Sequence, residues 1–158
     1  MPQSLAINLI HLIYSTKDRA PGLSPKIRDG LFAYKSGILK EWRSPSLLIG
    51  GVADHVHVLF CLSKNHALAK VIEELKKGSS KWLKTQGPEF RGFHWQAGYG
   101  AFSVSQSHVE RVRLYIQRQE EHHRTHSFQD ELLAFLNRYK MEHDERFPLG
   151  IITTGQII

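Results

Sequence analysis

The order of apolar segments along the chain constrains its fold more strongly than any other feature of the sequence. Residues 5–14 are rich in leucine and isoleucine, which predicts a buried strand. A helical pattern opens at Ser24, where a hydroxyl precedes a proline, and residues 46–62 hold two strands separated by a glycine pair. A second helix over residues 66–84 and a glycine-interrupted strand over residues 93–104 complete the unit. The order β-α-β-β-α-β predicts a ferredoxin-like α+β fold, an antiparallel sheet with helices on one face.

Two further helices are predicted after this unit. The first covers residues 107–124 and opens with a Ser-x-x-Glu capping box. Ser127 begins the second, whose apolar residues share one face: Phe128, Leu132, Phe135, Leu136 and Tyr139. We expect a single domain over residues 1–147 and a tail of unassigned role over residues 148–158.

Composition and charge narrow the functional classes. A chain of 158 residues with 41% hydrophobic content is long enough for one domain with a hydrophobic core. Cys61 is the only cysteine, which excludes an internal disulfide and a cysteine zinc cluster and favours the cytoplasm. We expect no signal peptide and no membrane span, because the apolar runs are short. The formal net charge of +6 favours a polyanionic partner such as nucleic acid.

A pair of histidines lies in the third predicted strand. His55 and His57 are two residues apart, so their rings should leave the same face of the sheet while Val56 enters the core. Their Cα atoms would be roughly 6.5 Å apart, close enough for both rings to bind one divalent ion. Asp54 could orient one of the rings. The alternative is a pair of histidines that simply faces solvent.

A second group of polar side chains is predicted on the helix over residues 107–124. Tyr115 and Gln119 are four residues apart and share a face, which His122 extends by one turn. The amide oxygen of glutamine is a hard ligand suited to Mg²⁺ or Mn²⁺. Tyrosine, with a pKa of about 10, is a weak nucleophile at neutral pH, and a divalent ion would offset the charge developing on an attacked phosphate. The alternative is an amphipathic helix with a half-buried tyrosine.

Taken together, these motifs resemble those of the IS200/IS605-type transposases and the related REP-associated tyrosine transposases. The resemblance rests on three motifs in this order: Asp54-His55-Val56-His57, the aromatic and glycine strand over residues 95–104, and Tyr115-x-x-x-Gln119. Residues 16–19 and 142–147 also fit, so the resemblance covers roughly residues 5–147.

The resemblance implies a metal-dependent transposase that cuts and rejoins single-stranded DNA beside imperfect hairpins. His55, His57 and Gln119 would hold one divalent ion, Mg²⁺ or Mn²⁺, and Tyr115 would become linked to a 5′-phosphate. It also implies a homodimer with composite active sites, in which the tyrosine helix of one subunit serves the histidines of the other. An exposed edge strand would offer the pairing surface for such a dimer.

Basic side chains provide candidate contacts to the DNA backbone. The residues predicted to bind phosphates lie on the second and third helices: Lys76, Lys77, Lys81 and Arg113. Trp82 and Tyr99 could stack on bases. The alternative is a set of solvated helix faces, which are common on basic proteins.

Three other functions fit parts of the sequence. A domesticated REP-associated nuclease would have the same residues and would process chromosomal hairpins. A DNA-binding regulator without catalysis would share the fold, although the complete set of motif residues argues against it. A zinc hydrolase could use His55, His57 and His122 without any need for a tyrosine.

Overall fold

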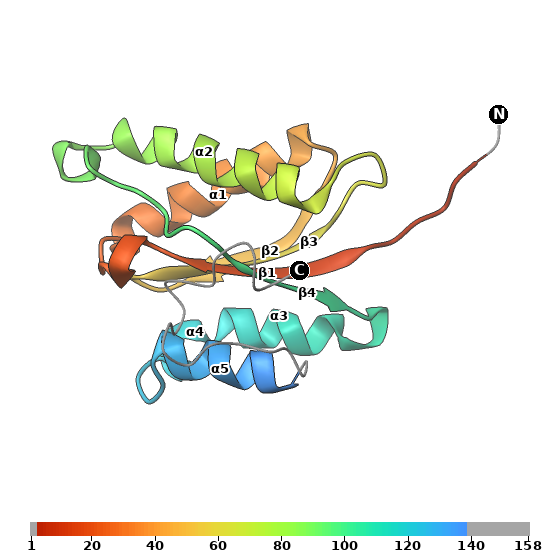
Figure 1. Ribbon diagram of the computed structural model, residues 1–158. Helices are drawn as coiled ribbons and strands as arrows, with labels where there is room; N and C mark the ends of the chain where they lie inside the picture. The colour runs from red at the N-terminus through yellow and green to blue at the C-terminus, as the bar shows by residue number, and fades with distance from the viewer. Residues whose placement is uncertain (1–2, 139–158) are drawn as a thin grey trace.

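The computed structural model describes residues 3–138 and shows a four-stranded antiparallel sheet between two layers of helices (Figure 1). The strands are β1 (Leu9–Ser15), β2 (Ser46–Gly51), β3 (His55–Cys61) and β4 (Gly100–Val104). Their order in the sheet is β2-β3-β1-β4. One helix connects β1 to β2 and another connects β3 to β4, so the predicted ferredoxin-like order is confirmed.

One face of the sheet is covered by α1 (Pro25–Glu41) and α2 (Leu68–Lys84) (Figure 1). The largest hydrophobic cluster lies between these helices and the sheet. Buried residues from the two helices meet alternate residues of β1 and β3 there: Leu31, Leu39, Val71, Ile72, Leu75, Leu12, Val56, Val58 and Phe60. This layer is the one that the apolar pattern of the sequence predicts.

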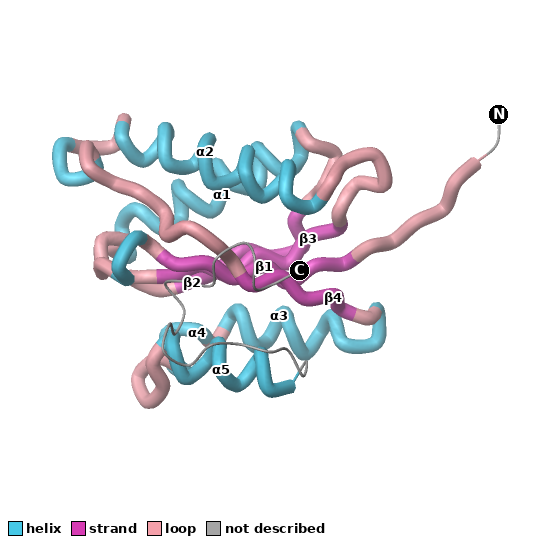
Figure 2. The backbone as a smooth tube through the Cα atoms, viewed as in Figure 1, coloured by secondary structure: helices cyan, strands magenta, loops and turns pink. Residues whose placement is uncertain are grey.

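The opposite face is covered by α3 (Val109–Gln117), α4 (Gln119–His122) and α5 (Phe128–Arg138) (Figure 2). The ferredoxin-like pattern places helices on one face only, and the structure shows that the additional helices cover the other. Strand β3 is therefore buried on both sides. Because its residues alternate, His55, His57 and Leu59 face the α3–α5 layer.

Two predicted strands are shorter in the structure than in the sequence pattern. Strand β1 begins at Leu9 instead of residue 5, because its partners β3 and β4 end opposite that residue. Leu5 and Ile7 consequently remain exposed. Strand β4, at the edge of the sheet, is preceded by a loop in which Trp95 makes an isolated bridge to Thr16.

The predicted helix over residues 107–124 is interrupted. Arg118 adopts φ −96° and ψ 17° and separates α3 from α4. Ser107 lies in a short 3-10 turn before α3, and no side chain caps the helix, so the predicted capping box is wrong. Ser127 does cap α5, because its hydroxyl oxygen accepts a hydrogen bond from the Asp130 amide at 3.1 Å.

Three short 3-10 helices complete the described elements: η1 (Lys17–Arg19), η2 (Pro88–Phe90) and η3 (Gln106–His108). Within residues 3–138, none of the helices combines the length and apolarity needed to cross a membrane. Tyr139, the matching segment 142–147 and the predicted tail 148–158 lie outside the described residues.

Candidate active site and metal centre

The two histidines of β3 form the floor of a buried polar site. His55 and His57 project from the same face, as predicted, and neither side chain is exposed. Their ring centroids are 5.2 Å apart. Gly50 on the neighbouring strand β2 lies opposite His57, so the strand beside this histidine has no side chain of its own at that position.

Each of these histidines has a polar partner on its Nδ1 side. His55 Nδ1 lies 2.7 Å from a carboxylate oxygen of Asp54, and His57 Nδ1 lies 2.8 Å from Nε2 of His11 on β1. The Nε2 atoms of both rings therefore point toward the α3–α5 layer. Metal-binding histidines typically show this arrangement, in which a partner on one nitrogen orients the other toward the ion.

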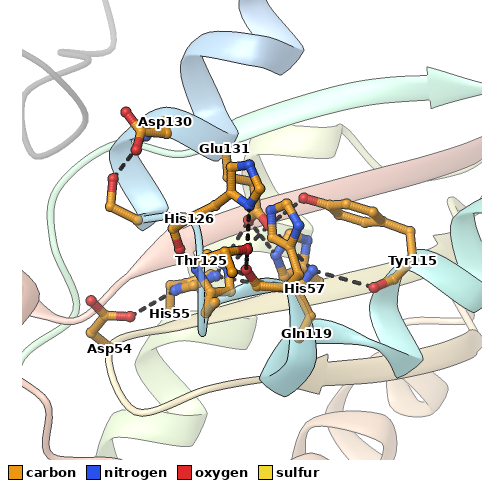
Figure 3. A network of polar contacts seen from close by, with 12 residues as sticks. Asp54, His55, His57, Tyr115, Gln119, Thr125, His126, Asp130 and Glu131 are labelled. Carbon is orange, nitrogen blue, oxygen red and sulfur yellow. Dashed lines mark hydrogen bonds and ion pairs between the residues drawn. The ribbon is translucent and has the colours of Figure 1, made fainter.

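Glu131 of α5 brings a carboxylate into the centre of the site (Figure 3). Its Oε1 lies 2.8 Å from His57 Nε2 and 3.3 Å from His55 Nε2. Its Oε2 lies 3.0 Å from Nε2 of His123, the residue after α4. One ligand atom from each of these four residues lies within 4.8 Å of the others, so the group could hold a metal ion.

Gln119 lies at the same cluster, where the sequence places the third ligand. Its Oε1 is 3.2 Å from His55 Nε2 and 3.0 Å from His123 Nε2, and the side chain is buried. The break at Arg118 allows both Gln119 and His123 to face β3. His122, the third ligand of the hydrolase alternative, is not in this group of four, although its Nε2 lies 3.2 Å from Glu131 Oε2.

Tyr115 reaches the cluster from α3. Its hydroxyl donates a hydrogen bond to Glu131 Oε2, and its ring centroid lies 5.7 Å from that of His57. The tyrosine predicted to be the nucleophile and the histidines predicted to bind metal therefore meet within one chain. The composite arrangement implied by the resemblance, with the tyrosine supplied by a partner, is not needed to assemble this site.

The charges at the site are strongly coupled. Burial opposes ionisation of Glu131, but the surrounding His57, His123 and His55 hold the pKa of its carboxyl far below the usual range. Burial also lowers the pKa of His57. For His55, burial acts in the same direction, but hydrogen bonds to Asp54 and Glu131 outweigh it and raise the pKa.

The phenol of Tyr115 is held in its neutral form. Burial raises its pKa well above the usual value, and the negative charge of Glu131 adds to the shift. At neutral pH the hydroxyl therefore keeps its hydrogen and donates it to the carboxylate. A group that accepts this proton is needed before the oxygen can act as a nucleophile.

The lysines predicted to bind DNA lie on the other side of the sheet from this site. Lys76, Lys77 and Lys81 belong to α2, and Figure 1 shows α2 on the opposite face of the sheet from α3–α5, the helices that contribute Tyr115, Gln119 and Glu131. Lys76 donates to the backbone carbonyl oxygens of Gln96 at 2.9 Å and Gly98 at 2.6 Å, so its ammonium group is engaged within the protein. Lys77 and Lys81 are exposed.

The predicted DNA contact on α3, Arg113, is half-buried. It donates to the carbonyl oxygen of Leu47 at 3.2 Å and lies 3.8 Å from the carboxylate of Glu110. These contacts tie α3 to the start of β2. They leave the predicted role of Arg113 in DNA binding without support from the local geometry.

Three residues of the site are absent from the sequence-based prediction: His11, His123 and Glu131. Glu131 had a detectable signal, because it lies between Phe128 and Leu132 on the apolar face of its helix, where a carboxylate requires a polar partner. His123 also had one, because it follows Gln119 by four residues and shares its face. His11 had none, because its partner His57 is 46 residues away in the sequence.

Comparisons with known proteins identify the family and the fold. The model of the family described as "Transposase IS200 like" matches residues 7–119. A solved structure from Deinococcus radiodurans R1, described as an inferred transposase, is 23% identical, with a TM-score of 0.59 over 75% of this chain and 98% of that one. A REP-associated tyrosine transposase bound to a REP hairpin is 12% identical, with a TM-score of 0.56 over 78% of this chain and 74% of that one.

A search of curated protein sequences gives no significant match. The two structural similarities, at these identities, establish the fold. The family match covers most of the chain, from β1 to Gln119, and includes the histidine pair and Tyr115. This chain belongs to the IS200-like transposase family.

Proposed function

We propose that this transposase cuts and rejoins single-stranded DNA through a covalent bond between Tyr115 and a 5′-phosphate. One observation carries the proposal: the hydroxyl of Tyr115 is hydrogen-bonded to a carboxylate that also contacts four histidine side chains. A nucleophile, a proton acceptor and a set of metal ligands thus occupy one buried site. A DNA-binding regulator without catalysis would not require this combination.

The residues of the chain can perform the step without a nucleotide cofactor. The Tyr115 oxygen attacks the scissile phosphorus, and the bond from phosphorus to the 3′ oxygen breaks. Glu131 Oε2 accepts the hydrogen bond of the phenol and, because its pKa lies far below the usual range, passes the proton on to solvent as the new bond forms. The released 3′ oxygen takes a proton from solvent. Because the phosphotyrosine bond conserves the energy of the diester, a 3′ hydroxyl can reverse the step and rejoin the strand.

The donor set favours Mn²⁺ over Mg²⁺ as the ion. Imidazole nitrogens from His55, His57 and His123 accompany oxygens from Glu131 and Gln119. Mg²⁺ prefers an all-oxygen shell, whereas Mn²⁺ accepts both nitrogen and oxygen ligands. When bound, the ion would polarise the scissile phosphate and offset its developing charge. Zn²⁺ also suits these ligands, so cleavage has to be compared with Mn²⁺, Mg²⁺ and Zn²⁺.

Hairpin DNA is the proposed substrate. The net charge of +6 suits a polyanion, and a structural neighbour is bound to a REP hairpin. A domesticated REP-associated nuclease would use the same residues. Hairpins on both sides of the gene would identify a mobile element, whereas hairpins scattered through the chromosome would identify the domesticated enzyme.

A homodimer is part of the proposal. Strand β4 lies at one edge of the sheet, where its outer backbone groups can pair with a second copy. Two-fold symmetry is the commonest arrangement for such assemblies. Since Tyr115 already lies beside its own histidines, we propose that each subunit of the dimer builds a complete site.

Two assays, one of DNA cleavage and one of metal binding, test this proposal. Labelled single strands from the DNA flanking the gene are incubated with the protein and Mn²⁺, Mg²⁺ or Zn²⁺. We expect cleavage with Mn²⁺ and weaker cleavage with Mg²⁺. Calorimetric titration of Mn²⁺ should show greater loss of affinity in His57→Ala than in Gln119→Ala. Unchanged affinity in His57→Ala, or zinc-dependent hydrolysis that survives Tyr115→Phe, would contradict the proposal.

A further inference from the structure

A cavity of about 660 Å³ lies directly beside Tyr115. It is bounded by residues of α3, the end of β4 and the last turns of α5, and His11 of β1 contributes to its wall. Tyr115 lines this cavity and also donates a hydrogen bond to Glu131 in the cluster of candidate metal ligands. The phenol therefore separates two compartments, the cluster of ligands and this neighbouring pocket.

The pocket is cationic. Arg111 and Arg138 line it from α3 and α5, and His108 adds a third basic side chain. Its lining, as far as residues 3–138 show it, includes no carboxylate. The arginine ion pairs in the described part of the chain involve Arg28 and Arg113 instead. Arg138 lies over the Phe135 ring at 5.6 Å, a contact that leaves its N–H groups free to donate to an anion.

The remaining wall of the pocket is apolar. Val112 and Phe135 line it next to the two arginines, and the Phe135 ring lies edge-on to Tyr115 at 5.4 Å between centroids. An aromatic face beside cationic groups suits a nucleotide, whose base can stack while its phosphate meets the charges. The volume lies within the range of about 300–1,000 Å³ typical of small-ligand sites.

One buried nitrogen atom in the wall of the pocket, Nδ1 of His11, has no hydrogen-bond partner among the described residues. His11 is 1% exposed, and its Nε2 is engaged by His57. Buried polar atoms are nearly always paired, so an unpaired imidazole nitrogen in a pocket wall indicates a group that binds there.

We infer that this pocket binds one unpaired nucleotide of the DNA strand, adjacent to the phosphate that Tyr115 attacks. The inference rests on the proposed function, because it places the scissile phosphate at the neighbouring cluster. Arg111 and Arg138 hold the phosphate of this nucleotide, and Val112 and Phe135 contact its base. The single strand thus enters through the α3–α5 side of the molecule and not along the lysines of α2.

Binding is measured without cleavage. Fluorescence anisotropy follows a labelled oligothymidylate of about ten nucleotides, in EDTA, over a series of salt concentrations. Arg111→Gln and Arg138→Gln should each weaken binding by about three- to tenfold at low salt. Each should also reduce the slope of log affinity against log salt by about 0.7, the value for one lost phosphate contact. Arg91→Gln, an exposed arginine on a loop outside the pocket, is the matched control and should change neither quantity.

Photocrosslinking identifies the contact directly. An oligonucleotide that contains 5-iododeoxyuridine should crosslink to peptides from α3 or α5. Crosslinks confined to α2, or a salt slope unchanged in both pocket variants, would overturn the inference even if the Tyr115 adduct forms. Conversely, normal pocket binding without any covalent adduct would contradict the proposed function and leave the nucleotide site standing.

Discussion

The hydroxyl of Tyr115 donates a hydrogen bond to Glu131, a residue of helix α5 that also contacts the histidines of the candidate metal site. The match to the family model ends at residue 119, twelve positions before this glutamate. Helix α5 therefore contributes a side chain to the candidate site in addition to packing on the sheet. The contact links the proposed nucleophile to the ligand cluster through one carboxylate.

The first prediction concerns this carboxylate. Glu131→Gln keeps the volume and an oxygen acceptor for Tyr115 but removes the charge that faces four histidines. We expect Mn²⁺ affinity to fall at least about tenfold, because a charged ligand is replaced by a neutral one. Calorimetric titration of the folded variant measures this change.

The matched control for that experiment is Glu121→Gln, which removes an exposed carboxylate from α4. It should bind Mn²⁺ like the unaltered protein. Equal affinity in the two variants would show that Glu131 is not a ligand.

The second prediction tests the fit between β2 and α3. A Cβ atom at Gly50 would lie 2.6 Å from Ile116 Cγ2 and 3.1 Å from the Ile116 carbonyl oxygen. Gly50→Ala should therefore push α3 outward and displace the adjacent Tyr115. We expect a loss of about 1–3 kcal/mol in urea unfolding and a larger drop in adduct formation than in Mn²⁺ affinity.

Gly37→Ala is the control for the glycine substitution. A Cβ at this position in α1 meets nothing within 4 Å. It should be neutral or raise the unfolding free energy by up to about 1 kcal/mol, because alanine favours helix. Equal effects of the two substitutions would contradict the close approach of α3 to β2.

The third prediction concerns the pH dependence of stability. Burial lowers the pKa of Lys76 to about 8. Between pH 8 and the unfolded pKa of about 10.4, the unfolded chain holds a proton that the folded protein has lost, so stability rises with pH. Lys76 contributes up to about 1.36 kcal/mol per pH unit in this window.

Lys76→Met should remove that contribution, which urea unfolding at pH 8 and pH 10 can measure. Lys35, whose pKa burial also lowers, adds a slope of the same sign that the variant keeps. The variant should bind oligothymidylate with an unchanged salt slope. A reduced salt slope with unaltered pH dependence would instead support the DNA contact predicted from the sequence.

The fourth prediction separates complete sites from composite ones. His57→Ala and Tyr115→Phe proteins are mixed under conditions that allow subunits to exchange. If each subunit builds its own site, every site in the mixed dimer has a defect and no adduct forms. Recovery of about a quarter of the unaltered activity, as expected for one intact composite site per mixed dimer, would show that the tyrosine acts on its partner.

The order of elements and the core of the site could be predicted from the sequence because their signals are local. Alternation along one strand fixes the face shared by His55 and His57. The sequence predicts one uninterrupted helix for Tyr115 and Gln119. The structure shows a break at Arg118, so the prediction of a continuous helix is wrong, but both residues still lie at the site.

Two other residues of the site depend on tertiary packing. Glu131 is 74 residues from His57, and His11 is 46 residues from it, so no local period relates them. The side of the sheet occupied by the last three helices was also not encoded in any local pattern. Only the packed structure shows that the lysines of α2 and the histidines of β3 lie on opposite faces.

The central claim, that Tyr115 forms the covalent bond to DNA, is tested most directly by locating the adduct. The protein is incubated with Mn²⁺ and single strands from the DNA flanking its gene, digested with trypsin and nuclease, and sequenced by mass spectrometry. Cleavage after Arg113 and Arg118 releases a five-residue peptide in which Tyr115 is the only tyrosine. We expect a nucleotide attached to that tyrosine, and no adduct in Tyr115→Phe. A nucleotide on Tyr99 or Tyr14, or an adduct that persists in Tyr115→Phe, would contradict it.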